Sequence, residues 1–423
     1  MPTELIILLI MLFVFAAAVF SLKLPAGIAL ALSAVIGAIA GGEGIPIRHL
    51  LEGSVAFIDP IMIVIAAMIF MKVSEATGAL ASLNYSIINS LHNYPTLLII
   101  LIMFFVMLPG MLTGISTTCI LTTGALVAPA LIAMGMPKQA AGSLIAMGAV
   151  YGMIAPPINL PIMIIGGGVD MPYVGFELPL LLLTFPLAIL SAVYYRFRFV
   201  KKFNPDDVTS KLPPSLYHKY GIRIYLPIIV VVFLMIIIRL LPMVIPDVGI
   251  PVIFIIGIAV SYFAGEKFDI IDLAGKSVRD ALPVLGILVG VGIFVQIMTL
   301  TGVRGYIAVS AIELPPAYLY LGIALIMPAF GSAFASSSVL GVPLIFVFIG
   351  SNEILVASAL SLIAGLGDLM PPPSLLPVFA SQLVGEKNHF TILKQSFFPI
   401  LASLSAALLL IYFAKNISSF LLM

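Results

Sequence analysis

The chain contains one apolar pattern twice, and each copy carries residues that interrupt helices. The first copy has a stretch rich in Gly, Ser and Thr at residues 113–118 and a double proline at residues 156–157. The second copy has a similar stretch at residues 331–338 and a triple proline at residues 371–373. Duplicated membrane units with helix-breaking residues at matching places are typical of secondary transporters, and the interrupted positions indicate the binding site.

The composition places the chain in a lipid bilayer. Hydrophobic residues make up 62% of the 423 residues and charged residues only 9%, whereas soluble domains carry roughly 25% charged residues. Apolar runs recur along the whole length, so we expect an all-α polytopic membrane protein. The net charge of +1 and the lack of a basic stripe argue against a nucleic-acid partner. The single cysteine, Cys119, excludes an internal disulfide.

The apolar runs predict about 11–12 transmembrane helices, at about 20 residues for each crossing. We expect them at 4–22, 25–41, 54–75, 95–110, 138–168, 177–196, 223–245, 250–264, 282–301, 317–329, 352–384 and 392–413. The helices at 138–168 and 352–384 contain the prolines, so we expect both to be broken near their middles.

Two further apolar segments are predicted to be re-entrant helical hairpins, at residues 113–135 and 331–350. Both are rich in Gly, Ser and Thr, and each is interrupted by a proline, Pro129 or Pro343. Non-helical backbone at membrane depth is tolerated only where it is buried in protein or lines a wet cavity. We therefore expect these hairpins to face the functional centre.

The repeat divides the chain into a first membrane half at 1–200, a linker at 201–222 and a second membrane half at 223–423. The stretch 196–223 has an excess of Lys and Arg over Asp, so the positive-inside rule predicts that it is cytoplasmic. The first helix begins close to Met1 without a basic leader and is expected to be retained.

Matching points in the two halves are Ile69-Phe70 with Thr77-Gly78, and Ile293-Phe294 with Thr301-Gly302. An inverted repeat needs an odd number of crossings between such points, but the predicted spans give an even number. The sequence therefore leaves open whether one span does not cross or the repeats are parallel. The segments after these points, 78–92 and 303–314, are less apolar and are expected to lie along the interface as amphipathic arms.

The interruptions offer oxygen ligands. Proline cannot donate to the helix ladder, so carbonyls before it lose their partners. Freed carbonyls and hydroxyls suit a hard cation such as Na⁺, and the half-helix N-termini at the same breaks suit a substrate carboxylate. We predict two cation sites, one in each half, with the substrate held between the hairpin tips.

The predicted substrate contacts share a place at a tip or a break: Thr113, Gly114, Ser116, Asn159, Ser332, Ser336 and Ser374. The predicted Na⁺ ligands lie in the same two regions: Ser116, Thr117, Thr118, Gly152, Ala155, Pro156, Ser336, Ser337, Ser338, Gly367, Asp368 and Met370. Small and hydroxyl residues also serve plain helix packing, but two such groups beside prolines at equivalent positions favour a binding role.

Asp368 is the sharpest single candidate, because ionisable residues inside membrane spans are functional by default. It is expected to ligate a cation, relay a proton or face a vestibule, with a structural pairing as the alternative. Glu177 and Arg239 fall at the ends of spans and are interpreted as boundary residues. No arginine lies inside the predicted site to indicate a carboxylate substrate.

The sequence motifs do not indicate an enzyme. The string Gly365-Leu366-Gly367-Asp368 resembles that of intramembrane aspartyl proteases, but such enzymes need a second membrane aspartate, and no Tyr-Asp pair is present. The chain also lacks an HExxH motif, a P-loop and a nucleophile elbow. We therefore expect a protein without enzymatic activity or cofactor, driven by an ion gradient.

The chain resembles the large membrane subunit of TRAP (tripartite ATP-independent periplasmic, DctM-like) transporters, in the wider ion-transporter superfamily. The resemblance rests on an ordered series of motifs along nearly the whole chain: residues 24–32, Leu51-Glu52-Gly53, the first hairpin with residues 152–157, Leu314-Pro315-Pro316, residues 331–343, residues 371–373 and residues 392–401.

This resemblance implies a scaffold and a mobile transport domain that moves as an elevator. It implies import of an organic acid, of the dicarboxylate or sugar-acid class, coupled to a Na⁺ gradient across the inner (cytoplasmic) membrane. The implied partners are a small four-helix membrane subunit and a soluble extracytoplasmic substrate-binding protein. Carried onto this sequence, Ser116, Thr117 and 152–157 serve the first Na⁺ site, and Ser336, Ser337 and 367–372 the second.

The chain departs from the family at its acids. The family commonly has an aspartate near each hairpin tip, whereas the tips here contain none. Asp368 stands where the family usually has an aliphatic residue. The alternative reading is therefore a stand-alone carrier of the same superfamily, or a proton-coupled antiporter that uses Asp368.

Overall fold

The computed structural model describes residues 2–200, 215–241 and 246–421, and it is helical throughout these ranges apart from short connections and one isolated bridge. The predicted linker lies largely outside them, at 201–214. Eight helical segments in the described ranges are long and apolar enough to cross a membrane, and six shorter apolar helices accompany them. The chain is thus an all-α polytopic membrane protein, as predicted.

Two segments that occupy equivalent positions in the two repeats pack antiparallel against each other. The first consists of α3 (Ile47–Val55) and α4 (Ile58–Ala76), and the second is the single long helix α16 (Ile270–Leu300). Near one end Gly53 lies against Gly292, and near the other Lys72 Nζ lies 3.4 Å from Asp280 Oδ2. Equivalent segments that run in opposite directions make the repeat inverted.

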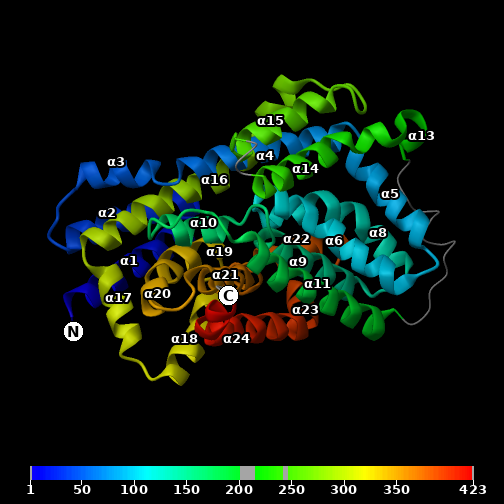
Figure 1. Cartoon of the computed structure of the whole chain (residues 1–423). Coiled ribbons are helices and arrows are strands. Elements are labelled where there is room, and N and C mark those ends of the chain that lie inside the picture. The colour runs from blue at the N-terminus through cyan, green and yellow to red at the C-terminus, as the bar shows by residue number, and fades with distance from the viewer. Residues whose placement is uncertain (1, 201–214, 242–245, 422–423) are drawn as a thin grey trace.

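Each of these segments is followed by a left-handed glycine and a short helix. Gly78 (φ 81°) precedes α5 (Ala79–Leu91), and Gly302 (φ 75°) precedes α17 (Val303–Ile312). The two short helices, which we call the arms, lie at opposite ends of the molecule (Figure 1). Their positions match the predicted segments 78–92 and 303–314.

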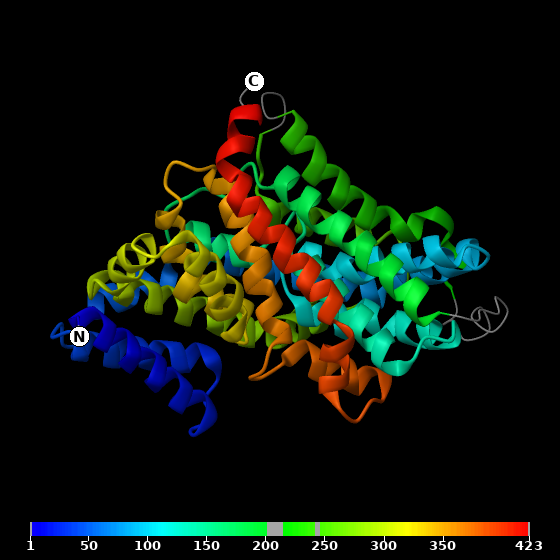
Figure 2. The same cartoon turned by 90° about the horizontal axis from the view of Figure 1, so that it is seen from below.

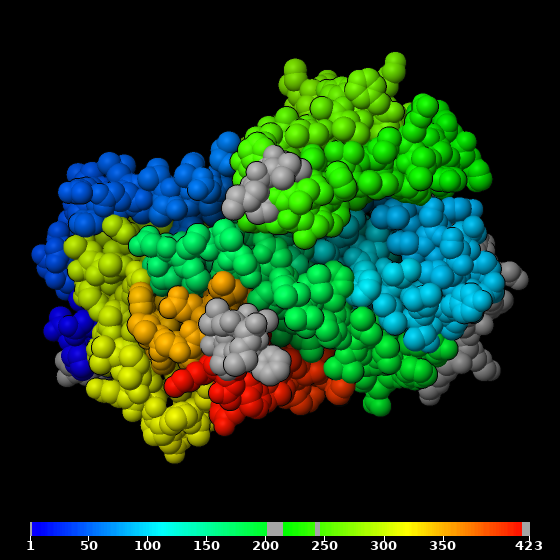
Figure 3. Space-filling model, in the orientation of Figure 1, coloured from blue at the N-terminus to red at the C-terminus, as the bar shows by residue number. Residues whose placement is uncertain are grey.

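The remaining outer helices pack on these segments or on one another. They are α1 (Thr3–Phe20), α2 (Ala26–Ala40), α14 (Leu226–Leu240) and α15 (Ile250–Ser261), with two short turns, α13 (Tyr217–Tyr220) and η2 (Gly221–Tyr225), before α14. Helices α1 and α2 lie at one edge (Figure 2), and α14 and α15 form a ridge over the rest of the molecule (Figure 3). We call α1–α4 and α14–α16 the frame.

Two helical hairpins lie beside the frame (Figure 1). The first is formed by α6 (Pro95–Thr113) and a second limb made of α7 (Ser116–Cys119), η1 (Ile120–Gly124) and α8 (Ala125–Ala133). The second is formed by α18 (Pro316–Ala329) and a limb made of α19 (Ala333–Ser336), η3 (Ser337–Gly341) and α20 (Val342–Val347). A π-helical turn occupies the same place in both second limbs.

The hairpin boundaries correct the predicted ones. The sequence predicts complete hairpins at 113–135 and 331–350, but these residues form only the second limbs. The first limbs are α6 and α18, which the sequence assigns to separate spans. Proline misled the prediction: the helix continues through Pro129, and Pro343 lies in the first turn of α20, where a missing N–H costs little.

This correction also accounts for the direction of the repeat. A hairpin enters and leaves on the same side, so its two limbs together add an even number of crossings. Counting α6 as a limb rather than as a separate span makes the number between matching points odd. The antiparallel packing of the matching segments therefore agrees with the revised count.

The two broken helices follow the hairpins as predicted. The first consists of α9 (Lys138–Ile154) and α10 (Leu160–Gly167), and the second of α21 (Glu353–Gly365), η4 (Leu366–Leu369) and α22 (Leu375–Val384). Helices α11 (Glu177–Phe199), α23 (His389–Gln395) and α24 (Phe397–Leu421) cover them, with α24 crossing this group in Figure 2. We call the hairpins and these helices the hairpin body.

Buried hydroxyls tie the helices of the hairpin body together. Tyr151 on α9 bonds Ser191 on α11 at 2.8 Å and Ser403 on α24 at 3.0 Å. Two turns earlier Ser143 on α9 contacts the hydroxyls of Tyr195 and Ser396 in the same way. Polar pairs between membrane helices are worth about 0.6 kcal/mol on average, so these two clusters align three helices without dominating their packing.

The frame depends on close approach of helix backbones. A Cβ added at Gly290 of α16 would overlap the carbonyl oxygen of Gly27 in α2, whereas one added at Gly286 would meet nothing within 4 Å. Small residues at such crossings let membrane helices pack by van der Waals contact.

We expect Gly290→Ala to lower the stability of the purified protein by about 1–3 kcal/mol, the usual cost of overpacking. Gly286→Ala, one turn away on the same helix, is the matched control and should be neutral or slightly stabilising, because alanine favours helix over glycine. Thermal unfolding in one detergent measures both. Equal melting temperatures for the two variants would contradict the close crossing.

Candidate functional site

Asp368 joins the turns of the two hairpins. Its Oδ2 accepts a hydrogen bond from Ser116 Oγ at 2.6 Å, and its Oδ1 accepts one from the backbone N–H of Ala333 at 2.8 Å. Ser116 begins α7 and Ala333 begins α19, so one carboxylate contacts the start of both second limbs. The Asp368 residue is only 7% exposed.

This position suits a negative charge. The first N–H groups of a helix have no partner within it and carry partial positive charge. Hydrogen bonds to an ionised acceptor are also stronger than neutral ones. The sequence assigns Ser116 and Asp368 to different cation sites, one in each half, yet the structure places their side chains in direct contact.

Asn159 braces the first break. Its Oδ1 accepts from the N–H of Ile162, while its Nδ2 donates to the carbonyl of Ile154 and to Ser361 Oγ, all at 2.9–3.1 Å. Its backbone N–H donates to the hydroxyl of Tyr173. Asn159 is fully buried, so its polar atoms hold α9, α10 and α21 together, and its predicted contact with substrate stays a prediction.

The second break is packed against the turn of the second hairpin. Gly331 has a left-handed backbone (φ 66°), and a Cβ there would overlap the carbonyl oxygen of Pro372. A Cβ at Gly367 would lie 3.3 Å from Ser332 N. The backbone of the turn therefore lies directly on the backbone of the break.

Two buried hydroxyls in the second half lack a partner. Ser336 Oγ and Ser374 Oγ are inaccessible and make no hydrogen bond to any residue in 2–200, 215–241 or 246–416. By contrast, Ser337 and Ser338 donate to the carbonyls of Ala333 and Ala335. A buried hydroxyl without a partner is costly, so Ser336 and Ser374 are the predicted residues most in need of a ligand.

The predicted residues of the first half have mixed surroundings. Thr113 Oγ1 donates to Pro109 O and accepts from Ile115 N–H, which closes the turn around left-handed Gly114. Thr118 Oγ1 lies 3.7 Å from the sulfur of Met68.

The other predicted residues fall into two groups by burial. Gly152, Ala155 and Pro156 are buried, and Gly152 packs on the backbone of Met107. Thr117, Ser332 and Met370 are partly exposed.

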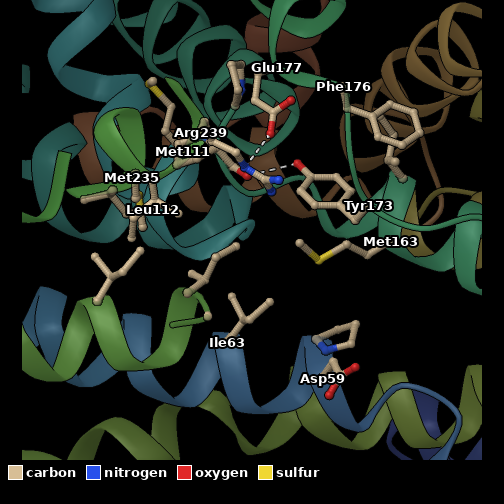
Figure 4. A pocket seen from close by; sticks show the side chains of 18 of the residues that line it. Asp59, Ile63, Met111, Leu112, Met163, Tyr173, Phe176, Glu177, Met235 and Arg239 are labelled. Atoms are coloured by element: carbon tan, nitrogen blue, oxygen red, sulfur yellow. Dashed lines mark hydrogen bonds and ion pairs between the residues drawn. The ribbon is translucent and has the colours of Figure 1, made fainter. Parts of the chain in front are cut away.

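A large cavity borders the first break. It has a volume of ≈ 920 Å³ and lies between α4 and α14 of the frame and α6, α10 and α11 of the hairpin body. Pro156, Pro157 and Tyr173 form part of its wall, with Glu177 and Arg239 beside them (Figure 4). Tyr173 Oη donates to the carbonyl of Pro157 at 3.0 Å, so the wall is bonded to the break.

The sequence gives no sign that Glu177 and Arg239 form an ion pair. Arg239 Nε lies 3.0 Å from Glu177 Oε1, although the sequence marks both only as boundary residues. They belong to α14 and α11, and no spacing or motif relates them. A second cavity of ≈ 680 Å³ lies at the other break, lined by Leu366, Met370 and Pro371 together with residues of α18, α23 and α24.

Comparison with known families gives a match over most of the chain. Residues 106–417 match the family model described as tripartite ATP-independent periplasmic transporter, DctM component. No curated protein matches significantly. The matched region includes both breaks and both hairpin turns.

Two solved transporters have a similar fold. One is the YdaH transporter of Alcanivorax borkumensis, with a TM-score of 0.60 and 15% identity over 86% of this chain and 87% of that one. The other is MtrF of Neisseria gonorrhoeae, described as illuminating a class of antimetabolite efflux pumps, with a TM-score of 0.64 and 14% identity over 90% and 93%. At this identity the likeness concerns the fold alone.

We expect Asp368→Ala to destabilise the protein by about 1–3 kcal/mol, because it leaves the Ala333 N–H and the Ser116 hydroxyl without their acceptor. Asp368→Asn retains an acceptor oxygen and should cost less. Ser358→Ala is the control, since that buried hydroxyl donates to Ile354 O within its own helix. Thermal unfolding ranks the variants, and an Asp368→Ala value no lower than that of Ser358→Ala would refute the joining role.

Proposed function

The chain belongs to the family of the DctM component of tripartite ATP-independent periplasmic transporters, and we propose that it imports a small organic acid driven by a Na⁺ gradient. It is thus a multi-pass membrane subunit of a secondary transporter. The finer parts of the proposal are the coupling ion, the substrate class and the movement that carries both.

One observation carries the Na⁺ proposal: the junction at Asp368 unites a carboxylate, a serine hydroxyl and the starts of two helical limbs, close in sequence to the second break at 370–374. These are oxygen donors, which hard cations prefer. Ser336 and Ser374 add hydroxyls that lack partners in the described chain. We assign the cation to Ser116, Asp368 and Ser336, where it would neutralise the buried carboxylate.

The proposed movement is of the elevator type. The frame is held together by α16, which packs on α2, α3 and α4, and the hairpin body by its own helix contacts. The arms join the two: Asn84 of α5 donates to Leu126 O at 3.2 Å, and the guanidinium of Arg304 in α17 lies 4.7 Å from the ring centre of Phe346. Both contacts reach the second limb of a hairpin, so an arm can transmit motion to it.

The proposed partners follow from the family. They are a small four-helix membrane subunit, a soluble extracytoplasmic substrate-binding protein and the organic acid itself, of the dicarboxylate or sugar-acid class. We place the subunit in the inner membrane, with the basic stretch 196–223 on the cytoplasmic side. Half of that stretch, at 201–214, lies outside the described residues.

A second candidate is a carrier driven by protons through Asp368. The observation in its favour is that this acid is buried where both hairpins meet, without a basic partner among its hydrogen bonds. Loss or gain of a proton there would change what the carboxyl oxygens bind at both turns. The cation that drives uptake separates the two candidates.

We expect NaCl to raise the melting temperature of the purified protein saturably above choline chloride at equal ionic strength, because a ligand that binds only the folded state stabilises it. Ser336→Ala should keep or slightly raise the basal stability, since its buried hydroxyl has no described partner to lose. It should weaken the Na⁺ response. Ser358→Ala should keep both. A wild-type curve that is identical in the two salts would count against Na⁺ sites.

Uptake into proteoliposomes tests the function directly. With partner subunits present and organic acids offered outside, an inward Na⁺ gradient should drive accumulation that collapses when the gradient is dissipated. Accumulation that follows a proton gradient and is lost in Asp368→Asn would instead establish the second candidate. No accumulation under either gradient would reject both.

A further inference from the structure

The cavity beside the first break has walls from both bodies. Ile63 of α4 and Met235 of α14 line it from the frame, while Met111 of α6, Met163 of α10 and Leu181 of α11 line it from the hairpin body. Its volume of ≈ 920 Å³ lies within the range of pockets that enclose small ligands. A molecule held there contacts both parts that move relative to each other in the proposed mechanism.

Arg239 presents a cation to this cavity. Its side chain is 36% exposed, and that of its partner Glu177 is 38% exposed, so neither is sealed into the protein. The recorded contact uses Nε, and within the described ranges no other hydrogen bond or ion pair of Arg239 is found. The two terminal nitrogens of the guanidinium form a fork that matches a carboxylate.

The rest of the lining limits which kind of molecule can bring a carboxylate to Arg239. Its polar side chains are those of Asp59, Tyr173, Glu177, Arg239 and Asp247, and the hydroxyl of Tyr173 is already bonded to the break. The described lining contains no Ser, Thr, Asn, Gln, His or Lys. Acceptors for hydroxyl groups are limited to the carboxylates of Asp59, Glu177 and Asp247, while most of the wall is apolar. A sugar acid with a hydroxyl on nearly every carbon would therefore bury several hydroxyls against hydrocarbon, which is costly.

A second carboxylate on the ligand would also lack favourable contacts in this cavity. Arg239 is the one basic residue in the described lining, and the other charged groups are acids. A dicarboxylate would therefore direct its second charge at apolar walls or at like charges. The lining that remains is built from Leu, Ile, Met, Phe, Val and Pro, which suits a branched, linear or aromatic hydrocarbon.

We infer that this cavity binds a monocarboxylate with an apolar body, and that Arg239 receives the carboxylate. The inference rests on the proposed function and narrows its substrate class away from dicarboxylates and sugar acids. Glu177 holds Arg239 in place without ligand and competes with the ligand for it. Tyr173, hydrogen-bonded to Pro157 and Asn159, connects the wall of the cavity to the first break.

The test uses the purified full-length chain in NaCl, with melting temperature read against increasing concentrations of four sodium salts: hexanoate, phenylacetate, succinate and gluconate. Hexanoate and phenylacetate should raise the melting temperature saturably. Succinate and gluconate should not raise it beyond the effect of NaCl. Hexanol, at the same concentrations, should not reproduce the rise, because it lacks the carboxylate.

The variants assign the effect to Arg239. Arg239→Gln should raise the Kd for hexanoate about 10- to 100-fold, the usual effect of losing a hydrogen bond to a charged group. It should leave the response to NaCl intact. Arg239→Lys retains the charge and the pairing with Glu177 but lacks the fork, so it should show a smaller loss. Glu177→Gln removes the carboxylate that competes with the ligand for Arg239, so it should lower the Kd for hexanoate.

Arg48→Gln and Glu52→Gln are the matched controls. This pair also joins an Arg Nε to a Glu oxygen, at 2.7 Å, but lies outside the cavity with Arg48 86% exposed. Neither variant should change hexanoate binding.

The outcomes separate this inference from the proposed function. A rise with succinate or gluconate that survives Arg239→Gln would overturn the inference and leave Na⁺-coupled import standing. A hexanoate effect matched by hexanol, or one abolished by added phosphatidylethanolamine in an Arg239-dependent way, would show an apolar or lipid pocket and overturn it as well. Absence of any response to NaCl would count against the proposed function itself.

Discussion

The acceptance of two hydrogen bonds by Asp368, one from each hairpin, is the interaction on which the centre of the molecule depends. It joins the first residues of two limbs that belong to different halves of the chain. A charge at this depth is expensive unless it is paired, and here the starts of two helical segments supply the compensation. Any cation or proton that reaches Asp368 changes the bonding of both hairpin turns at once.

The frame and the hairpin body meet different physical demands. In the frame, Gly27 and Gly53 bring α2 and α3 against the backbone of α16, so van der Waals contact holds long helices in fixed crossings. In the hairpin body, serine and tyrosine hydroxyls align helices laterally, and backbone breaks sit where the hairpin turns press on them. In the proposed elevator movement, the closely packed frame would be the fixed support, and the hairpin body would be the part that binds and moves.

Most of the architecture could be predicted from the chain alone, since helix-breaking residues recur in order. The breaks at 155–159 and 370–374, the arms and the place of the hairpin turns all follow from glycine and proline, whose effects are local. The hairpin limits could not, because a proline inside an apolar helix reads the same whether the helix ends there or continues. Only the structure shows that the helix continues through Pro129 and that Pro343 lies in the first turn of α20.

Composition and the order of helix-breaking residues are enough to establish an inverted or parallel pair of membrane units with oxygen-rich interruptions at matching places, because both act locally. Tertiary structure decided which interruptions meet. Ser116 and Asp368 lie 252 residues apart, and no pattern in the chain announces that one hydroxyl reaches the other half's carboxylate. Arg239 likewise reaches Glu177 because the last turn of α14 lies near the start of α11. Contacts between distant segments depend on how whole helices pack, and that information lies in the assembled fold.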